Sequence, residues 1–128
     1  MSLPTVIIDI IVEYSAEYEL LSWIVKDKLE WWQLSENPAA IHLLEQNTDK
    51  IKWLWLSRNP AAIHLLERNL NKICLIKLSE NPAAIHLIEQ NLDKINWYLL
   101  SRNPATIHLL EQNPDKIEWK QLSENPSI

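Results

Sequence analysis

Four histidines stand at equal intervals along the chain, and histidine is the residue type best suited to bind a metal or to titrate near neutral pH. They are His42, His64, His86 and His108. Zinc requires nitrogen ligands within about 2.1 Å of one ion, whereas neighbouring helices pack about 8–10 Å apart. Adjacent histidines would have to lean together, with Glu45 and its equivalents completing the ligands. We therefore expect surface histidines that pack beside residues such as Pro38 and Gln46 of their own helix, and metal binding is the less favoured alternative.

Other reactive residue types also recur in register, and this argues against a catalytic site. Ser35, His42 and Glu45 contain the groups of a nucleophilic triad, but the serine lies outside the helix expected to carry the other two. An active site needs residues with different roles in one pocket. Cys74, the only cysteine, is expected to be a half-buried replacement for Lys52 or Asn96. We expect no enzyme activity, no catalytic residue, no metal site and no cofactor.

The composition sets the broad class of the chain. It has 128 residues, of which 47% are hydrophobic and 23% charged, and this suits one compact domain. The absence of glycine excludes phosphate-binding loops and disfavours an all-β fold, because tight hairpin turns lose their usual residue. A net charge of −5 makes nucleic acid an unexpected partner. The apolar run from Val6 to Val12 contains Asp9, so it resembles core rather than a signal peptide or a membrane span.

From Trp31 onward one phrase returns every 22 residues, and this period decides the domain organisation. Copies begin near Leu34, Leu56, Leu78 and Leu100, and a truncated copy begins at Leu122. We expect residues 26–128 to form a tandem array. Residues 1–25 diverge from the pattern and are expected to be an apolar N-terminal cap or a self-association segment, either helix or strand.

Each copy contains two related halves that both carry an asparagine able to begin a helix. Asparagine is a favoured N-cap residue, and proline suits the first helical position. The pattern predicts helices from Pro38 to Gln46 and from Thr48 to Leu56, with Asp49 favourable in the first turn of the second. The predicted caps are Asn37, Asn59, Asn81 and Asn103 in the first halves, and Asn47, Asn69, Asn91 and Asn113 in the second halves.

Such short helices are marginal alone, so packing between copies must stabilise them. In the first predicted helix Ala40, Ile41 and Leu44 share one apolar face, and small residues at Ala39 and Ala40 allow close helix approach. Stacking the pairs would bury a continuous core. The fold class that we predict is therefore all-α, an α-solenoid of two-helix repeats with a divergent N-terminal capping segment.

The consensus Leu-Ser-x-Asn-Pro-x-Ala-Ile-x-Leu-Leu-Glu-x-Asn-x-Asp-Lys-Ile-x-Trp resembles short tandem repeats found in many proteins of large DNA viruses. The resemblance covers about residues 27–128, with departures at Leu75, where the pattern has Trp, and at Thr106, where it has Ala. It implies an all-helical repeat protein made in an infected cell, intracellular in the host cytoplasm or associated with the virion. It implies no catalytic residues.

Two sets of charged residues invite structural hypotheses. Glu45 and its equivalents fall near the end of the first helix, where the helix dipole disfavours an acid. We interpret Glu45 as reaching across the turn toward Lys50, with a solvated carboxylate as an equal alternative. The residue before each Asn-Pro alternates in sign: Glu36, Arg58, Glu80, Arg102 and Glu124. In-register stacking would place opposite charges next to each other, although each exposed pair contributes only about 0.2–1 kcal/mol.

Positions that vary between copies are the best candidates for binding a partner, because a shared frame has no reason to vary them. Amphipathic aromatic residues are enriched at protein interfaces. The candidate partner-binding residues are Trp32, Trp55, Tyr98, Lys77 and Leu99. Tryptophans that recur, such as Trp53, Trp97 and Trp119, are expected instead to fill gaps between the short helices.

The ends of the array suggest self-association, because terminal repeats normally need a polar outer face. The candidate residues are Val6, Ile7, Ile8, Ile10 and Ile11 at the start, and Trp119 and Leu122 near the end. We therefore hypothesise a non-enzymatic helical-repeat scaffold that binds an unidentified protein, with a possible homodimer through one end. The alternative is a structural homo-oligomeric assembly protein without a foreign partner.

Overall fold

The computed structural model describes residues 20–128, and its regular structure there is entirely helical. The α-helices are α2 (Trp31–Glu36), α3 (Ile41–Glu45), α4 (Trp53–Leu56), α5 (Ile63–Glu67), α6 (Leu75–Leu78), α7 (Ile85–Glu89), α8 (Trp97–Leu100), α9 (Ile107–Gln112) and α10 (Trp119–Leu122). Short 3₁₀ turns are η1 (Lys26–Lys28), η2 (Pro38–Ala40), η3 (Thr48–Lys50), η4 (Leu70–Lys72) and η5 (Pro114–Lys116). The prediction of an all-α fold is confirmed for residues 20–128.

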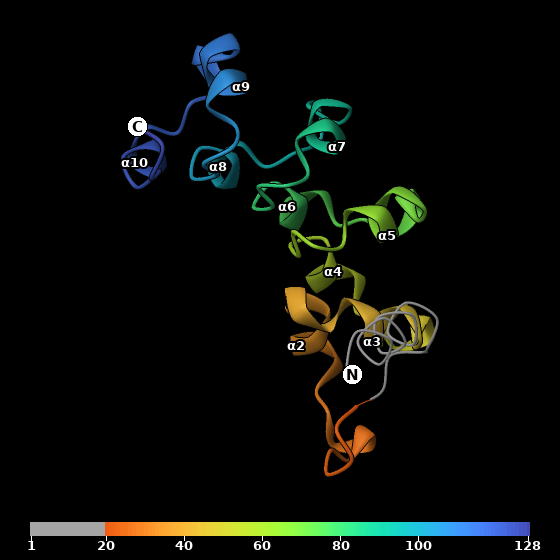
Figure 1. Ribbon diagram of the computed structural model, residues 1–128. Helices are drawn as coiled ribbons and strands as arrows, with labels where there is room; N and C mark the ends of the chain where they lie inside the picture. The colour runs from red at the N-terminus through yellow and green to blue at the C-terminus, as the bar shows by residue number, and fades with distance from the viewer. Residues whose placement is uncertain (1–19) are drawn as a thin grey trace, which may run out of the picture.

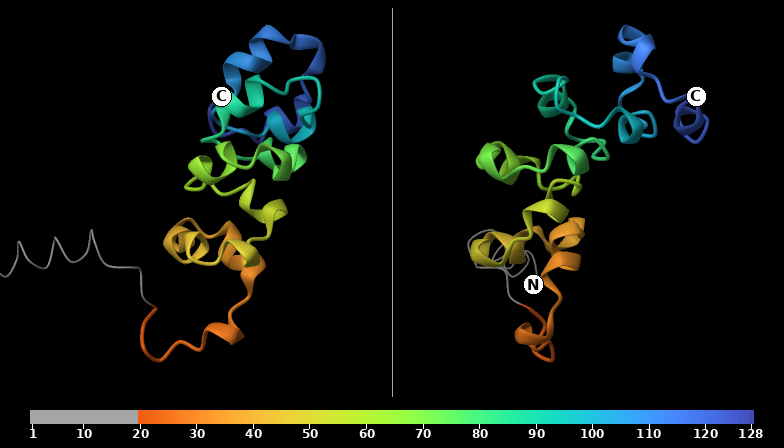
Figure 2. Two further views of the ribbon diagram at one scale, coloured as in Figure 1. Left: turned by 90° about the vertical axis from the view of Figure 1, so that its right-hand side faces the viewer. Right: turned by 180° about the vertical axis from the view of Figure 1, so that it is seen from behind.

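The α-helices lie in two rows along a bent molecule (Figures 1 and 2). We call α3, α5, α7 and α9 the outer row. We call α2, α4, α6, α8 and α10 the inner row, because Figure 1 shows them on the hollow side of the bend. The chain passes from one row to the other and back, so consecutive helices of one row are separated by one helix of the other.

The core lies between the two rows. Each outer-row helix buries two adjacent large side chains, as α5 does with Leu65 and Leu66. The inner helices α4, α6 and α8 each bury one leucine completely. Ala40, Ala62 and Ala84 are also buried, whereas Ala39 is exposed, so only the second alanine of the pair lies in the close contact that we predicted. Burial of these apolar side chains holds helices that are too short to persist alone.

The predicted helix from Thr48 to Leu56 is wrong, because two extended residues divide it. Thr48–Lys50 forms the turn η3, Ile51 and Lys52 are extended, and α4 begins at Trp53. In the first half, Pro38–Ala40 also forms a 3₁₀ turn, and α3 covers only Ile41–Glu45 of the range predicted to reach Gln46.

A buried serine of the preceding inner helix explains the division. Ser35 Oγ accepts the backbone N–H of Lys52 at 2.9 Å and donates to Trp31 O at 2.7 Å. That N–H therefore bonds between copies instead of within a helix. The same bond joins Ser57 to Cys74, Ser79 to Asn96 and Ser101 to Glu118.

The first asparagine of each copy forms the local cap bond and also a longer one. Asn81 Oδ1 accepts the N–H of Ala83 at 3.0 Å, which is the bond expected of a residue that begins a helical turn. Its Nδ2 donates to Ser57 O at 3.0 Å and Asn59 O at 3.1 Å, both in the preceding copy. Equivalent cap bonds are made by Asn37, Asn59, Asn103 and Asn125, and equivalent bonds to the preceding copy by Asn59, Asn103 and Asn125.

The second asparagine of each copy does not cap the helix that follows it, so this part of the prediction is wrong. Asn47 Nδ2 donates backward to Leu43 O at 2.8 Å, and its side chain makes no cap bond to the following turn. Asn69, Asn91 and Asn113 likewise donate to Leu65 O, Leu87 O and Leu109 O. These asparagines therefore satisfy carbonyl groups in the outer-row helices, where the last turn leaves acceptors unpaired.

The two departures from the repeated phrase have separate structural consequences. Thr106 replaces alanine at a fully buried position, and its hydroxyl lies 2.8 Å from Leu100 O and 3.0 Å from Asn103 O. Leu75 replaces a tryptophan whose ring elsewhere faces a lysine, as Trp53 faces Lys72 Nζ at 4.8 Å. The threonine therefore satisfies its polar atom locally, and the leucine lacks the ring needed for a cation–π contact.

Candidate protein-interaction surface

Four large apolar side chains stand exposed at the same position of successive inner helices. Trp32, Leu54, Ile76 and Tyr98 are each the second residue of their helix, and 41–54% of each residue's surface is exposed. We call these four residues the apolar row. Exposed apolar groups that lie together commonly mark interaction sites.

The helical period explains why these side chains face outward. Residues two positions apart point to nearly opposite sides of an α-helix. In α4, Leu56 is fully buried, so Leu54 must face solvent. The same relation holds for Ile76 with Leu78 in α6.

One end of the apolar row carries an aromatic pair joined to a cation. The rings of Trp32 and Trp55 have centroids 5.2 Å apart and are tilted by 48°. Lys77 Nζ lies 5.9 Å from the Trp55 ring and 3.2 Å from Glu80 Oε1. A continuous contact therefore runs across α2, α4 and α6.

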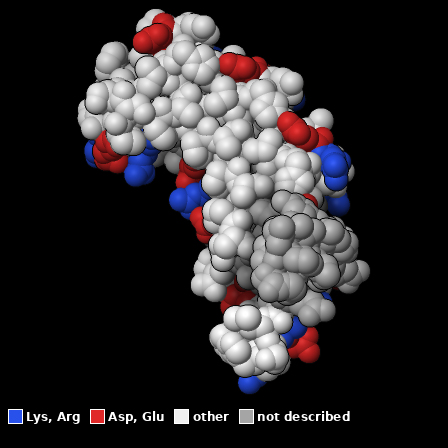
Figure 3. Space-filling model, viewed as in Figure 1, with Lys and Arg blue, Asp and Glu red and all other residues white. Residues whose placement is uncertain are grey.

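Charged residues follow the apolar row four positions later along the chain. Arg58 Nη1 lies 2.8 Å from Glu36 Oε1, and Arg58 Nε lies 3.0 Å from Glu80 Oε2. Arg102 Nε lies 3.3 Å from Glu124 Oε2. The sequence prediction that opposite charges meet between successive copies is confirmed for these three pairs. Figure 3 shows acidic and basic side chains side by side on the hollow side of the bend.

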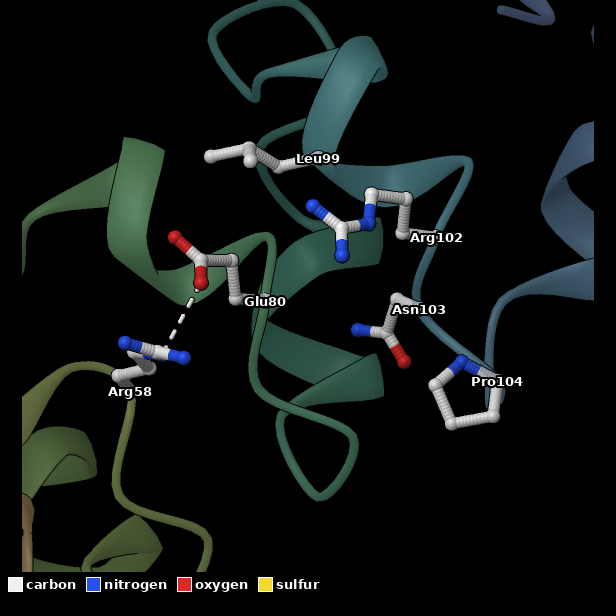
Figure 4. A pocket seen from close by; sticks show the side chains of 6 residues that line it. All are labelled: Arg58, Glu80, Leu99, Arg102, Asn103 and Pro104. Atoms are coloured by element: carbon white, nitrogen blue, oxygen red, sulfur yellow. Dashed lines mark ion pairs between the residues drawn. The ribbon is translucent and has the colours of Figure 1, made fainter. Parts of the chain in front are cut away.

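A shallow hollow of about 210 Å³ opens beside this charged row (Figure 4). Its lining residues are Arg58, Glu80, Leu99, Arg102, Asn103 and Pro104. The hollow offers a donor, an acceptor and an apolar wall. It therefore suits part of a peptide better than a wholly apolar ligand.

The structure brings together only part of the predicted partner-binding set. Trp32, Trp55 and Lys77 form the contact described above, whereas Tyr98 and Leu99 lie on α8 farther along the inner row. Leu99 lines the hollow. The candidate set omitted Leu54 and Ile76, although each occupies the same place in its copy as Trp32 and Tyr98. The hollow itself depends on side-chain packing and had no signal in the sequence.

The predicted self-association residues fall in two parts of the chain. Val6, Ile7, Ile8, Ile10 and Ile11 lie outside the described residues. On α10, Trp119 is 67% exposed, whereas Leu122 is half-buried. Trp119 therefore does not fill a gap between helices as we expected.

On the outer row, the histidines contact glutamates of the preceding copy. The Nε2 atoms of His64, His86 and His108 lie 2.6, 2.5 and 3.0 Å from Oε1 of Glu45, Glu67 and Glu89. The interpretation that Glu45 reaches toward Lys50 is wrong. The three histidines are half-exposed, as expected of surface residues, but the expectation did not include their contact with the preceding copy. Lys50 Nζ instead lies 5.2 Å from the Trp31 ring. In residues 20–128, no group of three His, Cys, Asp or Glu side chains is placed to hold a metal ion.

The serine of the triad considered above, Ser35, has a structural role. Ser35 is fully buried, and its hydroxyl makes the two backbone bonds described above. His42 instead lies 3.6 Å from Glu45 within its own helix. Cys74 is half-buried at the start of α6, as expected for a replacement of Lys52 or Asn96.

Comparison with family models, with curated proteins and with solved structures finds no match to this chain. Within the described residues, no helix has the length and apolar character needed to cross a lipid bilayer.

Proposed function

We propose that this chain is a non-enzymatic α-solenoid scaffold whose inner row binds a partner protein. The observation that carries the proposal is the apolar row, which exposes a different large side chain on each of four successive helices. A regular frame that presents varied side chains is the way in which repeat proteins commonly recognise partners. Trp32 and Trp55 supply the aromatic groups on which interface energy tends to concentrate.

The charges beside the apolar row support protein as the partner class. Arg58, Glu80 and Arg102 border a hollow that combines donors and acceptors with the apolar side chain of Leu99. Interfaces between proteins commonly have such an apolar centre and a polar rim. The resemblance to repeats of large DNA viruses adds the proposed setting, an infected cell, in its cytoplasm or associated with the virion.

Affinity capture with matched variants tests this function. The native chain, the double variant Trp32→Ala/Trp55→Ala and the control Leu70→Lys would be incubated with lysate from infected cells. Leu70 is 60% exposed on η4 and belongs to none of the inner-row helices, so its variant changes an exposed apolar residue outside the apolar row. We expect a protein that binds the native chain and the control but is lost from the double variant. Retention of every captured protein by the double variant would contradict the proposal.

Homo-oligomeric assembly without a foreign partner is the second candidate, and the exposed ring of Trp119 favours it. An exposed tryptophan on α10 offers a second copy a large apolar contact. Sedimentation of the purified native chain over a range of concentrations separates the two candidates. A mass that rises with concentration supports assembly, whereas a constant monomer mass contradicts it.

A further inference from the structure

A segment that covers the apolar row must contact four neighbouring helices of the inner row. Its members lie on α2, α4, α6 and α8, and helices pack about 8–10 Å apart, so the row spans about 24–30 Å. Each member exposes close to half of its surface. A cover must therefore be long, narrow and apolar on one side.

The chain itself contains a segment with these properties, in residues 6–12. Six of these seven residues are valine or isoleucine, and the seventh is Asp9. In an extended conformation, which is the one that the docking requires, alternate residues would share one side, with Val6, Ile8, Ile10 and Val12 together and Asp9 opposite. Seven extended residues span about 23 Å, close to the length of the apolar row. Fully burying each valine or isoleucine side chain contributes about 1.5–3 kcal/mol.

Residues 1–19 are acidic, whereas charges of both signs border the apolar row and pair with each other. Residues 1–19 contain four acids, Asp9, Glu13, Glu17 and Glu19, and no lysine or arginine. The cations beside the middle of the apolar row are Arg58, Lys77 and Arg102, with Glu36, Glu80 and Glu124 as their present partners. Arg102 also lines the hollow next to Leu99 (Figure 4). We expect a carboxylate of the docked segment to pair with Arg102 there. Such pairs orient a docked segment more than they strengthen its binding.

The length of the preceding chain allows the contact to form within one molecule. Nineteen residues before Leu20 reach at most about 60–70 Å when extended, more than twice the length of the apolar row. A tethered segment has an effective concentration on the order of millimolar, so binding within the molecule outcompetes binding between molecules in dilute solution.

We propose that residues 6–12 of the chain dock on its own apolar row, across α2, α4, α6 and α8. The docked segment shields Trp32, Leu54, Ile76 and Tyr98 from water. If the inner row binds a partner as proposed above, that partner must displace the segment, so this regulatory consequence rests on the proposed function. The docking itself does not.

The single cysteine allows a direct test in the full chain. Cys74 lies two residues before Ile76, so a nitroxide attached to its thiol stands beside the middle of the apolar row. In a ¹⁵N-labelled sample, we expect the amide signals of residues 6–12 to lose most of their intensity in the oxidised state and to recover on reduction of the nitroxide. Full-intensity signals from residues 6–12, while amides around Cys74 are broadened, would overturn the proposal.

Two controls distinguish the docked segment from other outcomes. Ile76→Lys places a charge in the row and should restore the signals of residues 6–12, whereas Leu70→Lys should leave them broadened. A mixture of spin-labelled unenriched chain with ¹⁵N-labelled Cys74→Ser chain reports contacts between molecules. Broadening of residues 6–12 in this mixture, with none in the dilute single-label sample, would assign the contact to a second copy and contradict docking within the chain. No partner protein is needed, so failure of this test is separate from failure of the proposed function.

Discussion

The outer and inner rows are built from the same repeated phrase, yet they differ in how strictly each position is kept. The outer helices α3, α5 and α7 read Ile-His-Leu, then Leu or Ile, then Glu, with a single conservative change. The inner helices α4, α6 and α8 read Trp-Leu-Trp-Leu, Leu-Ile-Lys-Leu and Trp-Tyr-Leu-Leu. Only the final leucine is constant among these three.

Burial and contacts between copies account for this difference. An outer helix such as α7 buries Leu87 and Ile88 and places His86 against Glu67 of the preceding copy. An inner helix such as α6 buries only Leu78 completely. Leu75 also packs against the core, so only the two middle side chains of the helix are free to vary without opening it. Variation at the first of these two positions produces the apolar row. The outer row therefore fixes the stack, whereas exposed positions of the inner row can vary from copy to copy.

Two isoleucines, one in each row, should show the largest difference in their contribution to stability. Ile88→Ala removes a fully buried side chain from α7 and should lower the free energy of unfolding by about 2–5 kcal/mol. Ile76→Ala removes a side chain that is 54% exposed on α6. This variant should change the free energy of unfolding by no more than about 0.5 kcal/mol. Urea unfolding followed by circular dichroism measures both. Equal losses would mean that the inner row supports the stack as strongly as the outer row.

A smaller loss is expected from the bonds that join one copy to the next. Asn81→Ala leaves Ser57 O, Asn59 O and the N–H of Ala83 without their partner in a buried site, and should lower the free energy of unfolding by about 1–3 kcal/mol. Asn71→Ala, at an exposed position on η4, is the matched control and should have little effect. Thermal unfolding that does not distinguish the two variants would contradict the role assigned to Asn81.

The smallest expected effect is a gain in stability. It concerns Leu75, which stands where other copies have a tryptophan that faces a lysine. Leu75→Trp should place an indole beneath Lys94, as Trp53 lies beneath Lys72, and should stabilise the fold by about 0.5–1 kcal/mol. The double variant Leu75→Trp/Lys94→Ala separates the cation–π contact from the larger apolar surface. A gain that survives removal of the lysine would assign it to packing alone.

The helical class of the fold was predictable from the sequence, because it depends on local patterns. The 22-residue interval between equivalent residues was predictable for the same reason. The alternation of Glu36, Arg58 and Glu80 also predicted contacts that the structure contains. The division at Ile51 and Lys52 was not predictable from local pattern, because it depends on a bond to Ser35, seventeen residues earlier. The wrong expectations for Lys52 and Glu45 both involve a polar group that bonds to a different copy, whereas the wrong cap prediction for Asn47 involves a bond within its own copy.

The candidate surface was predictable only in part, for a related reason. Variation between copies singled out Trp32 and Tyr98, since the residue type at a given repeat position can be compared from copy to copy. Exposure at Leu54 and Ile76 follows from which side of a four-residue helix faces the core, and so short a helix has no clear apolar period. The contact of His64 with Glu45 needed the distance between two stacked turns, which the sequence alone does not contain.

The backward bonds of Asn59, Asn81, Asn103 and Asn125 have a mechanical consequence. Each joins a copy only to its immediate predecessor, across 22 or 24 residues. Links arranged in series all carry the same tension, so pulling on the two ends loads every junction equally and the weakest yields first. Under force the copies should unfold one after another, each adding one step of extension, rather than unfold together in a single event.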